Sequence, residues 1–183
     1  MAEQLEILDV RVGSPRASLS APSKQRLDLT IDVRNNSKTT LHAITSVRSL
    51  DYDAATQTLF VGLSEPELAP GVRPSTFIAP HTTTIAPKKT ETISVSVPAV
   101  INKLIPSGGQ LGLGVESVDV SGVQTVKFEI AYGPTPFYPK PADSPANMSQ
   151  ELRSWGKKAQ KTLERSAGAD TKPAKRPRKS REE

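Results

Sequence analysis

Few side chains in this sequence could carry out proton, metal or nucleophilic chemistry. The chain has no cysteine and only two histidines, His42 and His81. Without cysteine there is no thiolate nucleophile, no disulfide and no cysteine-based zinc site. A metal site recruits several ligands, so each isolated histidine is more typical of a surface or packed side chain than of a ligand. We therefore predict no catalytic residue, no metal site and no cofactor, and we expect a protein that is not an enzyme.

Oxygen-bearing side chains lie close together at Asp51, Asp53 and Thr56. A calcium site needs about six to eight oxygen ligands, and the remaining positions of a calcium loop are absent here. Asp and Thr also favour turns, in which the Asp side chain accepts a hydrogen bond from the backbone two residues on. The sequence thus predicts an ordinary hairpin turn at Asp53.

Positive charge is concentrated at the C-terminal end of the chain. Up to Met148 there are 13 Lys and Arg against 14 Asp and Glu, a net charge of −1, and beyond it 11 against 5, a net charge of +6. The last 35 residues therefore hold the basic excess, which favours anionic partners. The predicted anion-binding residues are Lys157, Lys158, Lys161, Arg165, Lys175, Arg176, Arg178 and Lys179.

Apolar side chains in the same region recur at spacings of three and four, which is the pattern of one helix face. Ser144 followed by Pro145 supplies an N-cap and a proline in the first turn, so we predict a basic amphipathic helix over residues 144–167. Like charges four residues apart weaken such a helix, and we expect it to form fully only when its apolar face is covered or its cations are neutralised. The predicted partner-binding residues on that face are Met148, Leu152, Trp155 and Leu163.

The chain before residue 134 is dominated by alternation of apolar and polar residues, the period of a half-buried antiparallel strand. Turn signals such as Asn35-Asn36-Ser37 and Ser121-Gly122 separate the alternating runs. Seven short strands with such turns are typical of an antiparallel β-sandwich. The seven runs are 8–12, 27–34, 41–50, 59–63, 93–97, 111–115 and 126–132.

Three segments do not alternate. Apolar residues between Pro98 and Pro106 fall at helical spacing, which predicts a helical turn there. The proline-rich stretch 64–87 suits an irregular crossing or a broken edge strand. Phe137 and Tyr138 stand among prolines, and they are compatible either with a docking peptide or with a lid that folds back on the sandwich.

Two runs carry a resemblance to a known superfamily. The sequence LTIDVRNNS at 29–37, followed by IAPKKTETISVSVP at 85–98, resembles the second and fifth strands of bacterial immunoglobulin-like accessory domains. The resemblance implies a seven-stranded immunoglobulin-like sandwich and a role in adhesion or protein contact, and it transfers no catalytic residue. The tryptophan and cysteine pair of antibody domains is missing, because Trp155 lies outside the predicted sandwich.

These patterns predict an all-β domain with a C-terminal extension and a non-enzymatic function in protein interaction, as an adaptor or assembly module. The alternatives are nucleic-acid binding through the basic extension and attachment to an anionic membrane surface. No small-molecule substrate is indicated. The N-terminus has no basic and apolar leader pattern, so we expect a cytoplasmic protein, or a nuclear one in a eukaryotic cell. The predicted units are a sandwich over 1–133, a Pro-rich linker over 134–143, the helix over 144–167 and a disordered basic tail over 168–183.

Overall fold

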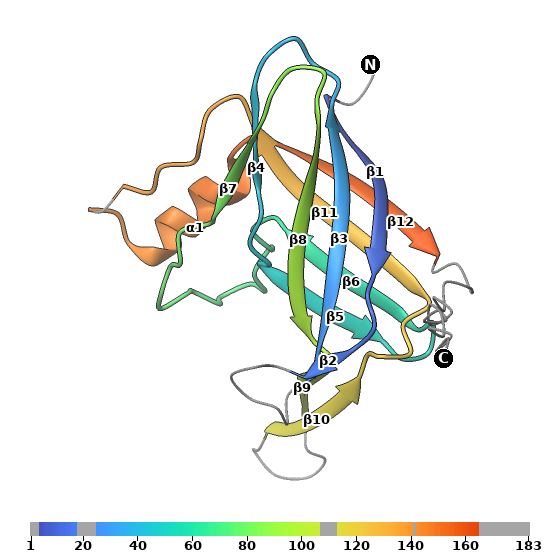
Figure 1. Cartoon of the computed structure of the whole chain (residues 1–183). Helices are drawn as coiled ribbons and strands as arrows, with labels where there is room; N and C mark the ends of the chain where they lie inside the picture. Colours follow the sequence, from blue (N-terminus) through green and yellow to red (C-terminus); the bar gives the residue numbers. More distant parts are fainter. Residues whose placement is uncertain (1–3, 18–24, 107–112, 141, 165–183) are drawn as a thin grey trace, which may run out of the picture.

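The computed structural model describes residues 4–17, 25–106, 113–140 and 142–164 (Figure 1). Over these ranges the backbone forms twelve strands, arranged in three sheets, and one helix. The prediction of an all-β fold is therefore confirmed. The predicted count of seven strands is too low, because several strands lie in segments whose sequence shows no alternation. The predicted tail lies outside the described residues.

The first sheet is built around the long strand β3 (Gln25–Asn35), which pairs antiparallel with β1 on one side and with β8 on the other. Alternate residues of β3, namely Leu27, Leu29, Ile31 and Val33, are fully buried and belong to one core shared with the second sheet. The sequence alternation therefore predicted correctly which side chains of β3 face the core. The other strands of this sheet are β1 (Leu5–Val12), β2 (Arg16–Ala17) and β8 (Thr90–Pro98).

The second sheet has β11 (Thr125–Gly133) at its centre. One edge of β11 pairs in parallel with β6, the other edge pairs antiparallel with β12, and β4 pairs with its last two residues. The parallel pair departs from the prediction of an all-antiparallel sheet. Parallel pairing is available here because the long chain between β6 and β11 passes through the first sheet before it returns. The remaining strands are β4 (Leu41–Ile44), β5 (Ser49–Asp53), β6 (Thr58–Leu63), β7 (Thr82–Ile85) and β12 (Lys157–Glu164).

A two-stranded ribbon of β9 (Val100–Pro106) and β10 (Leu113–Asp119) projects from one end of the molecule (Figure 1). The helical turn predicted for the first of these segments is wrong. Exposure alternates along β9, with Val100 48% exposed and Ile101 8% exposed, which is the period of a strand. The β-branched residues at its start favour this extended backbone, and β10 supplies the pairing partner.

Only the first part of the predicted C-terminal helix is helical. The helix α1 (Pro145–Ser154) begins as predicted, with the Asn147 N–H donating to the Ser144 side chain at 3.3 Å. Beyond Ser154 the prediction is wrong, because Gly156 adopts a left-handed φ of 69° and the chain continues as β12. Pairing with β11 satisfies backbone groups along all of β12, and extended backbone moves apart the like charges that weaken a helix.

The β fold also continues past the boundary predicted at residue 133. The strand β12 lies between β11 and the edge of β1, where the Lys161 ammonium donates to the carbonyls of Ile7 and Leu8 at 2.8 and 2.9 Å. The register of β1 with β3 shifts between Ile7 and Asp9, a bulge that leaves Leu8 unpaired in the ladder. Lys161 therefore links the two sheets, and the segment up to Glu164 belongs to the same folded unit.

The confirmed strand phase gives a direct test in β3. We expect Ile31→Ala to cost about 2 to 5 kcal/mol of unfolding free energy, because it removes a fully buried side chain. Asp32→Ala should cost less than about 1 kcal/mol, because Asp32 lies on the outer face, paired with the exposed Arg11 at 2.8 Å. Urea unfolding of the two variants measures the contrast, and equal costs would contradict the assigned phase.

The corrected boundary gives a second test. A chain that ends after Gly133 loses β12 and the buried Leu152 and Ala159, so we expect its unfolding free energy to fall by at least about 3 kcal/mol. A chain that ends after Glu164 keeps all of these contacts and should unfold like the full chain in the same urea titration. Equal stability of the two truncated chains would show that β12 contributes nothing to the fold.

Candidate functional site

Three segments meet at the end of the molecule that carries α1: the irregular loop 64–81, the described parts of the linker at 134–140 and 142–143, and the helix itself (Figure 1). Their aromatic side chains form a continuous row. The Phe77 and Phe137 ring centroids are 6.1 Å apart, and those of Phe137 and Trp155 are 6.2 Å apart with an edge-to-face arrangement. Such contacts add about 0.5 to 1.5 kcal/mol per pair beyond simple burial. We call this row, Phe77, Phe137 and Trp155, the aromatic cluster.

Two glycines let the aromatic cluster approach the second sheet. A Cβ atom at Gly133 would lie 3.1 Å from ring atoms of Trp155, so the absence of a side chain lets the indole rest on the end of β11. At Gly156 a Cβ atom would lie 2.1 Å from the carbonyl oxygen of Tyr132, in a backbone conformation that already disfavours other residues. The turn from α1 into β12 therefore requires glycine.

A largely buried ion pair joins loop 64–81 to α1 and to the segment between β4 and β5. Arg48 donates to Glu65 Oε2 through Nε at 2.7 Å, and the two side chains are only 12% and 10% exposed. The other oxygen of Glu65 accepts from the Ser149 hydroxyl of α1 at 2.6 Å. Arg48 also donates to the Ile78 carbonyl at 2.6 Å and its guanidinium lies 5.5 Å from the centroid of the Phe77 ring. Every member is partnered, which is the condition under which a buried charge network makes a region rigid.

Two large apolar side chains beside this network are exposed to solvent. Ile78 is 74% exposed and Tyr138 is 75% exposed. Each is the chain neighbour of a phenylalanine of the aromatic cluster, and the rings of those two phenylalanines have centroids 6.1 Å apart. We call Ile78 and Tyr138 the apolar pair. Protein-contact surfaces commonly contain exposed aromatic and aliphatic side chains that a rigid part of the fold holds in place.

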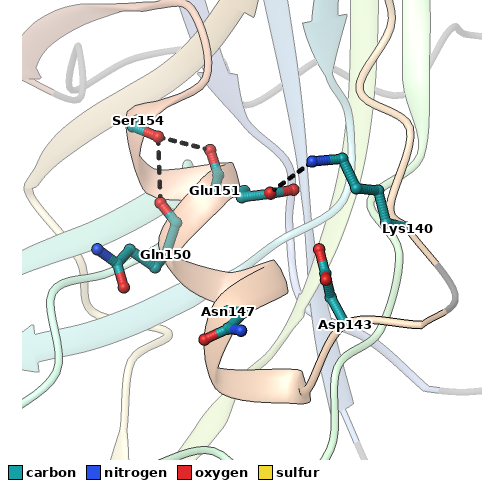
Figure 2. Close-up of a pocket in the computed structure, with 6 residues that line it drawn as sticks. All are labelled: Lys140, Asp143, Asn147, Gln150, Glu151 and Ser154. Atoms are coloured by element: carbon teal, nitrogen blue, oxygen red, sulfur yellow. Dashed lines mark hydrogen bonds and ion pairs between the residues drawn. The ribbon is translucent and has the colours of Figure 1, made fainter.

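The adjacent face of α1 is polar. A shallow hollow of about 340 Å³ lies between the helix and the linker, lined by six polar side chains (Figure 2). Lys140 reaches from the linker to Glu151 at 3.1 Å, and this hydrogen bond and the charge of Glu151 raise the pKa of the Lys140 ammonium. The Ser154 hydroxyl donates to the Gln150 and Glu151 carbonyls. The polar composition of this hollow fits the rim of a contact surface.

A second hollow, of about 350 Å³, lies on the outer face of the second sheet, over β6, β11 and β12. Its carboxylate is Glu129, which accepts from Ser64 and Gln160 and pairs with the Lys158 ammonium at 3.0 Å. Burial raises the pKa of Glu129, but these hydrogen bonds and the positive charge outweigh burial and lower the pKa. A carboxylate held in its charged form by three partners is a structural group, and it is poorly suited to accept a proton.

The residues predicted to bind a partner do not form one free helix face. Leu152 is buried in the core, while Met148, Trp155 and Leu163 are half-buried. Leu163 moreover belongs to β12 and not to α1. The two aromatic residues for which we left open a docking peptide or a lid differ in their surroundings, since the Phe137 ring contacts Phe77 and Trp155 while Tyr138 is exposed.

The predicted anion-binding residues are also divided. Lys157 and Lys158 are exposed on β12, with Lys158 paired to Glu129, and Lys161 is engaged by the carbonyls of β1. The other five lie outside the described residues, and they are Arg165, Lys175, Arg176, Arg178 and Lys179.

The small polar clusters have local roles. Asp53 accepts from the Ala55 N–H at 3.0 Å and from the Thr56 hydroxyl at 2.8 Å, which confirms the predicted turn. The His42 ring contacts the Thr84 hydroxyl, and the backbone of His81 bonds to residues 45 and 46. No group of three or more His, Asp or Glu in the described ranges could hold a metal ion.

Several residues of the site could not be found by sequence reasoning. Arg48, Glu65 and Ser149 are far apart in the chain and follow no motif, and Phe77 and Ile78 lie in a stretch with no period. The one available signal was the aromatic pair in the linker at residues 137 and 138.

Comparison of the chain with models of protein families, with curated proteins and with solved structures gives no match. Function therefore has to be inferred from the geometry of this chain. In the part of the chain that the structure describes, no helix has the length and apolar character needed to cross a membrane.

The turn that carries Trp155 can be tested with two glycine variants. We expect Gly156→Ala to lower the unfolding free energy by at least about 2 kcal/mol, because it adds both a left-handed strain and a clash with the Tyr132 carbonyl. Gly122→Ala is the control, since nothing lies within 4 Å of a Cβ atom there. Urea unfolding and Trp155 fluorescence report the two effects, and an unchanged Gly156→Ala variant would contradict the described turn.

Proposed function

We propose that this chain is a non-enzymatic protein-interaction module whose contact surface is the apolar pair, Ile78 and Tyr138, with the polar face of α1 as its rim. The observation that carries the proposal is the exposure of these two large side chains, 74% and 75%, on a base that is otherwise tightly fixed. A soluble protein gains nothing in folding free energy from such exposed side chains. Their burial in a complex supplies binding free energy.

The rigidity of the base supports this function. The Arg48–Glu65–Ser149 network and the aromatic cluster hold loop 64–81 and the linker in one arrangement. A partner therefore meets a preformed surface and does not have to order it, which lowers the entropic cost of binding. The proposed immunoglobulin-like relationship agrees with a role in protein contact, but it rests on the two sequence runs alone.

Binding of nucleic acid or of anionic lipid receives less support from the described residues. Two of the three predicted cations on β12 already have partners within the fold, Lys158 with Glu129 and Lys161 with the carbonyls of β1. A cation held in this way is not free to neutralise a phosphate. These alternatives depend on the five predicted anion-binding residues that lie beyond Glu164.

The experiment places a photoreactive benzoylphenylalanine at position 138 or, as a control, at position 115, where Val115 is 62% exposed on the ribbon. We expect one discrete adduct from position 138 in cells that make the protein, and none of that mass from position 115. The purified partner should then bind Tyr138→Ala at least about 30-fold more weakly, the effect of losing an aromatic hot spot, and Val115→Ala normally. Equal binding of the two variants would contradict the proposed surface.

A further inference from the structure

The edges of the two larger sheets, as far as the structure describes them, are protected with one exception. The edge of β1 has a bulge, and its carbonyls are occupied by Lys161. The edge strand β5 presents Asp51 and Asp53, and Lys103 bonds to its backbone and pairs with Asp51 at 2.6 Å. The strand β12 is rich in lysine, and β7 has only four residues. Charges, bulges and short length are the devices that prevent strand addition.

The strand β8 has almost none of these devices. It is nine residues long, it pairs with β3 without a register shift, and Glu91 is its one charged residue. No strand in the described ranges pairs with its second edge. Its sequence, TETISVSVP, is rich in β-branched residues and hydroxyl side chains, which favour extended pairing.

The hydrogen bonds at the two ends of β8 show which backbone groups face outward. The Asn35 N–H donates to the Lys89 carbonyl, and the Ala99 N–H donates to the Gln25 carbonyl. Odd-numbered residues of the strand therefore direct their N–H and C=O groups toward β3, because these groups alternate along a strand whose register is continuous. The even-numbered residues Thr90, Thr92, Ser94 and Ser96 direct theirs toward the free edge.

Only some of the backbone groups on the free edge of β8 remain available for pairing. Arg26 donates to the Ser96 carbonyl at 2.6 Å and to its hydroxyl at 2.9 Å, and Pro98 has no N–H to offer. The open backbone groups are thus those of Thr90, Thr92 and Ser94, with the N–H of Ser96. Their side chains lie on the outer face and are uncharged.

We propose that this edge binds β8 of a second copy of the chain, so that two first sheets join into one continuous antiparallel sheet. With the two-fold axis beside Ile93, Thr92 lies opposite Ser94 of the second copy, and Glu91 lies opposite an apolar valine. No like charges face each other directly, and hydroxyl side chains pair across the junction. The same self-pairing of β5 or β12 would bring carboxylates or ammonium groups together, so β8 is the edge suited to an isologous contact.

The test uses position 94. In the joined sheet the two Ser94 residues are diagonal neighbours on the outer face, and long side chains at this position can reach each other. The full chain, of 19.7 kDa, should sediment as a dimer, with slowed hydrogen exchange at Thr92 and Ser94.

Ser94→Lys and Ser94→Glu should each be monomeric, because each brings like charges together at the axis. An equimolar mixture of the two variants should regain the dimer, which shows that both are folded. Thr162→Lys, on the outer face of β12, is the matched control and should remain dimeric.

Several outcomes would overturn the proposal. A wild-type chain that is monomeric at every concentration excludes self-association, including association through β8. A dimer that persists in both Ser94 variants places the contact elsewhere, and a mixture that stays monomeric excludes pairing in this register. The dimer is independent of the apolar pair, so Tyr138→Ala should leave it intact while it weakens the proposed partner contact.

Discussion

The pairing of β12 with β11 is the constraint on which the arrangement of this molecule depends. It runs from Thr125 opposite Glu164 to Tyr132 opposite Lys157, and it places a C-terminal segment beside the central strand of the second sheet. This one ladder sets the position of Lys161 against β1, of Gly156 against Tyr132, and of Trp155 over Gly133. The helix α1 is consequently held between two fixed points, the linker and the turn.

Three charged side chains of this fold bind groups on other elements and so hold separate segments together. Lys161 occupies the carbonyls at the bulge of β1, Glu129 collects three donors across the second sheet, and Arg48 joins Glu65 under the aromatic cluster. Each group is held by partners from other elements, so its charge stabilises a contact between segments.

The two proposed contact surfaces lie in different parts of the described chain. The apolar pair lies at the end that carries α1, and the open edge of β8 lies along the first sheet. One offers side chains on a rigid base, and the other offers backbone groups in a continuous ladder. Because they lie on different elements, the proposed dimer through β8 would leave the apolar pair available to the proposed partner. Such a division of surfaces suits an assembly module.

Local sequence patterns were enough to predict the strands whose alternation is strong and the residue at which α1 begins. Leu27 to Val33, Val126 to Ile130 and the Ser144 cap follow from patterns within a few residues, and the structure confirms them. Residues 157–164 have helical spacing as well as acceptable strand residues, and only the free edge of β11 decided between the two. The Arg48–Glu65–Ser149 network and the open edge of β8 depend on contacts between distant segments. Such contacts leave no local period in a sequence, so the tertiary structure alone could specify them.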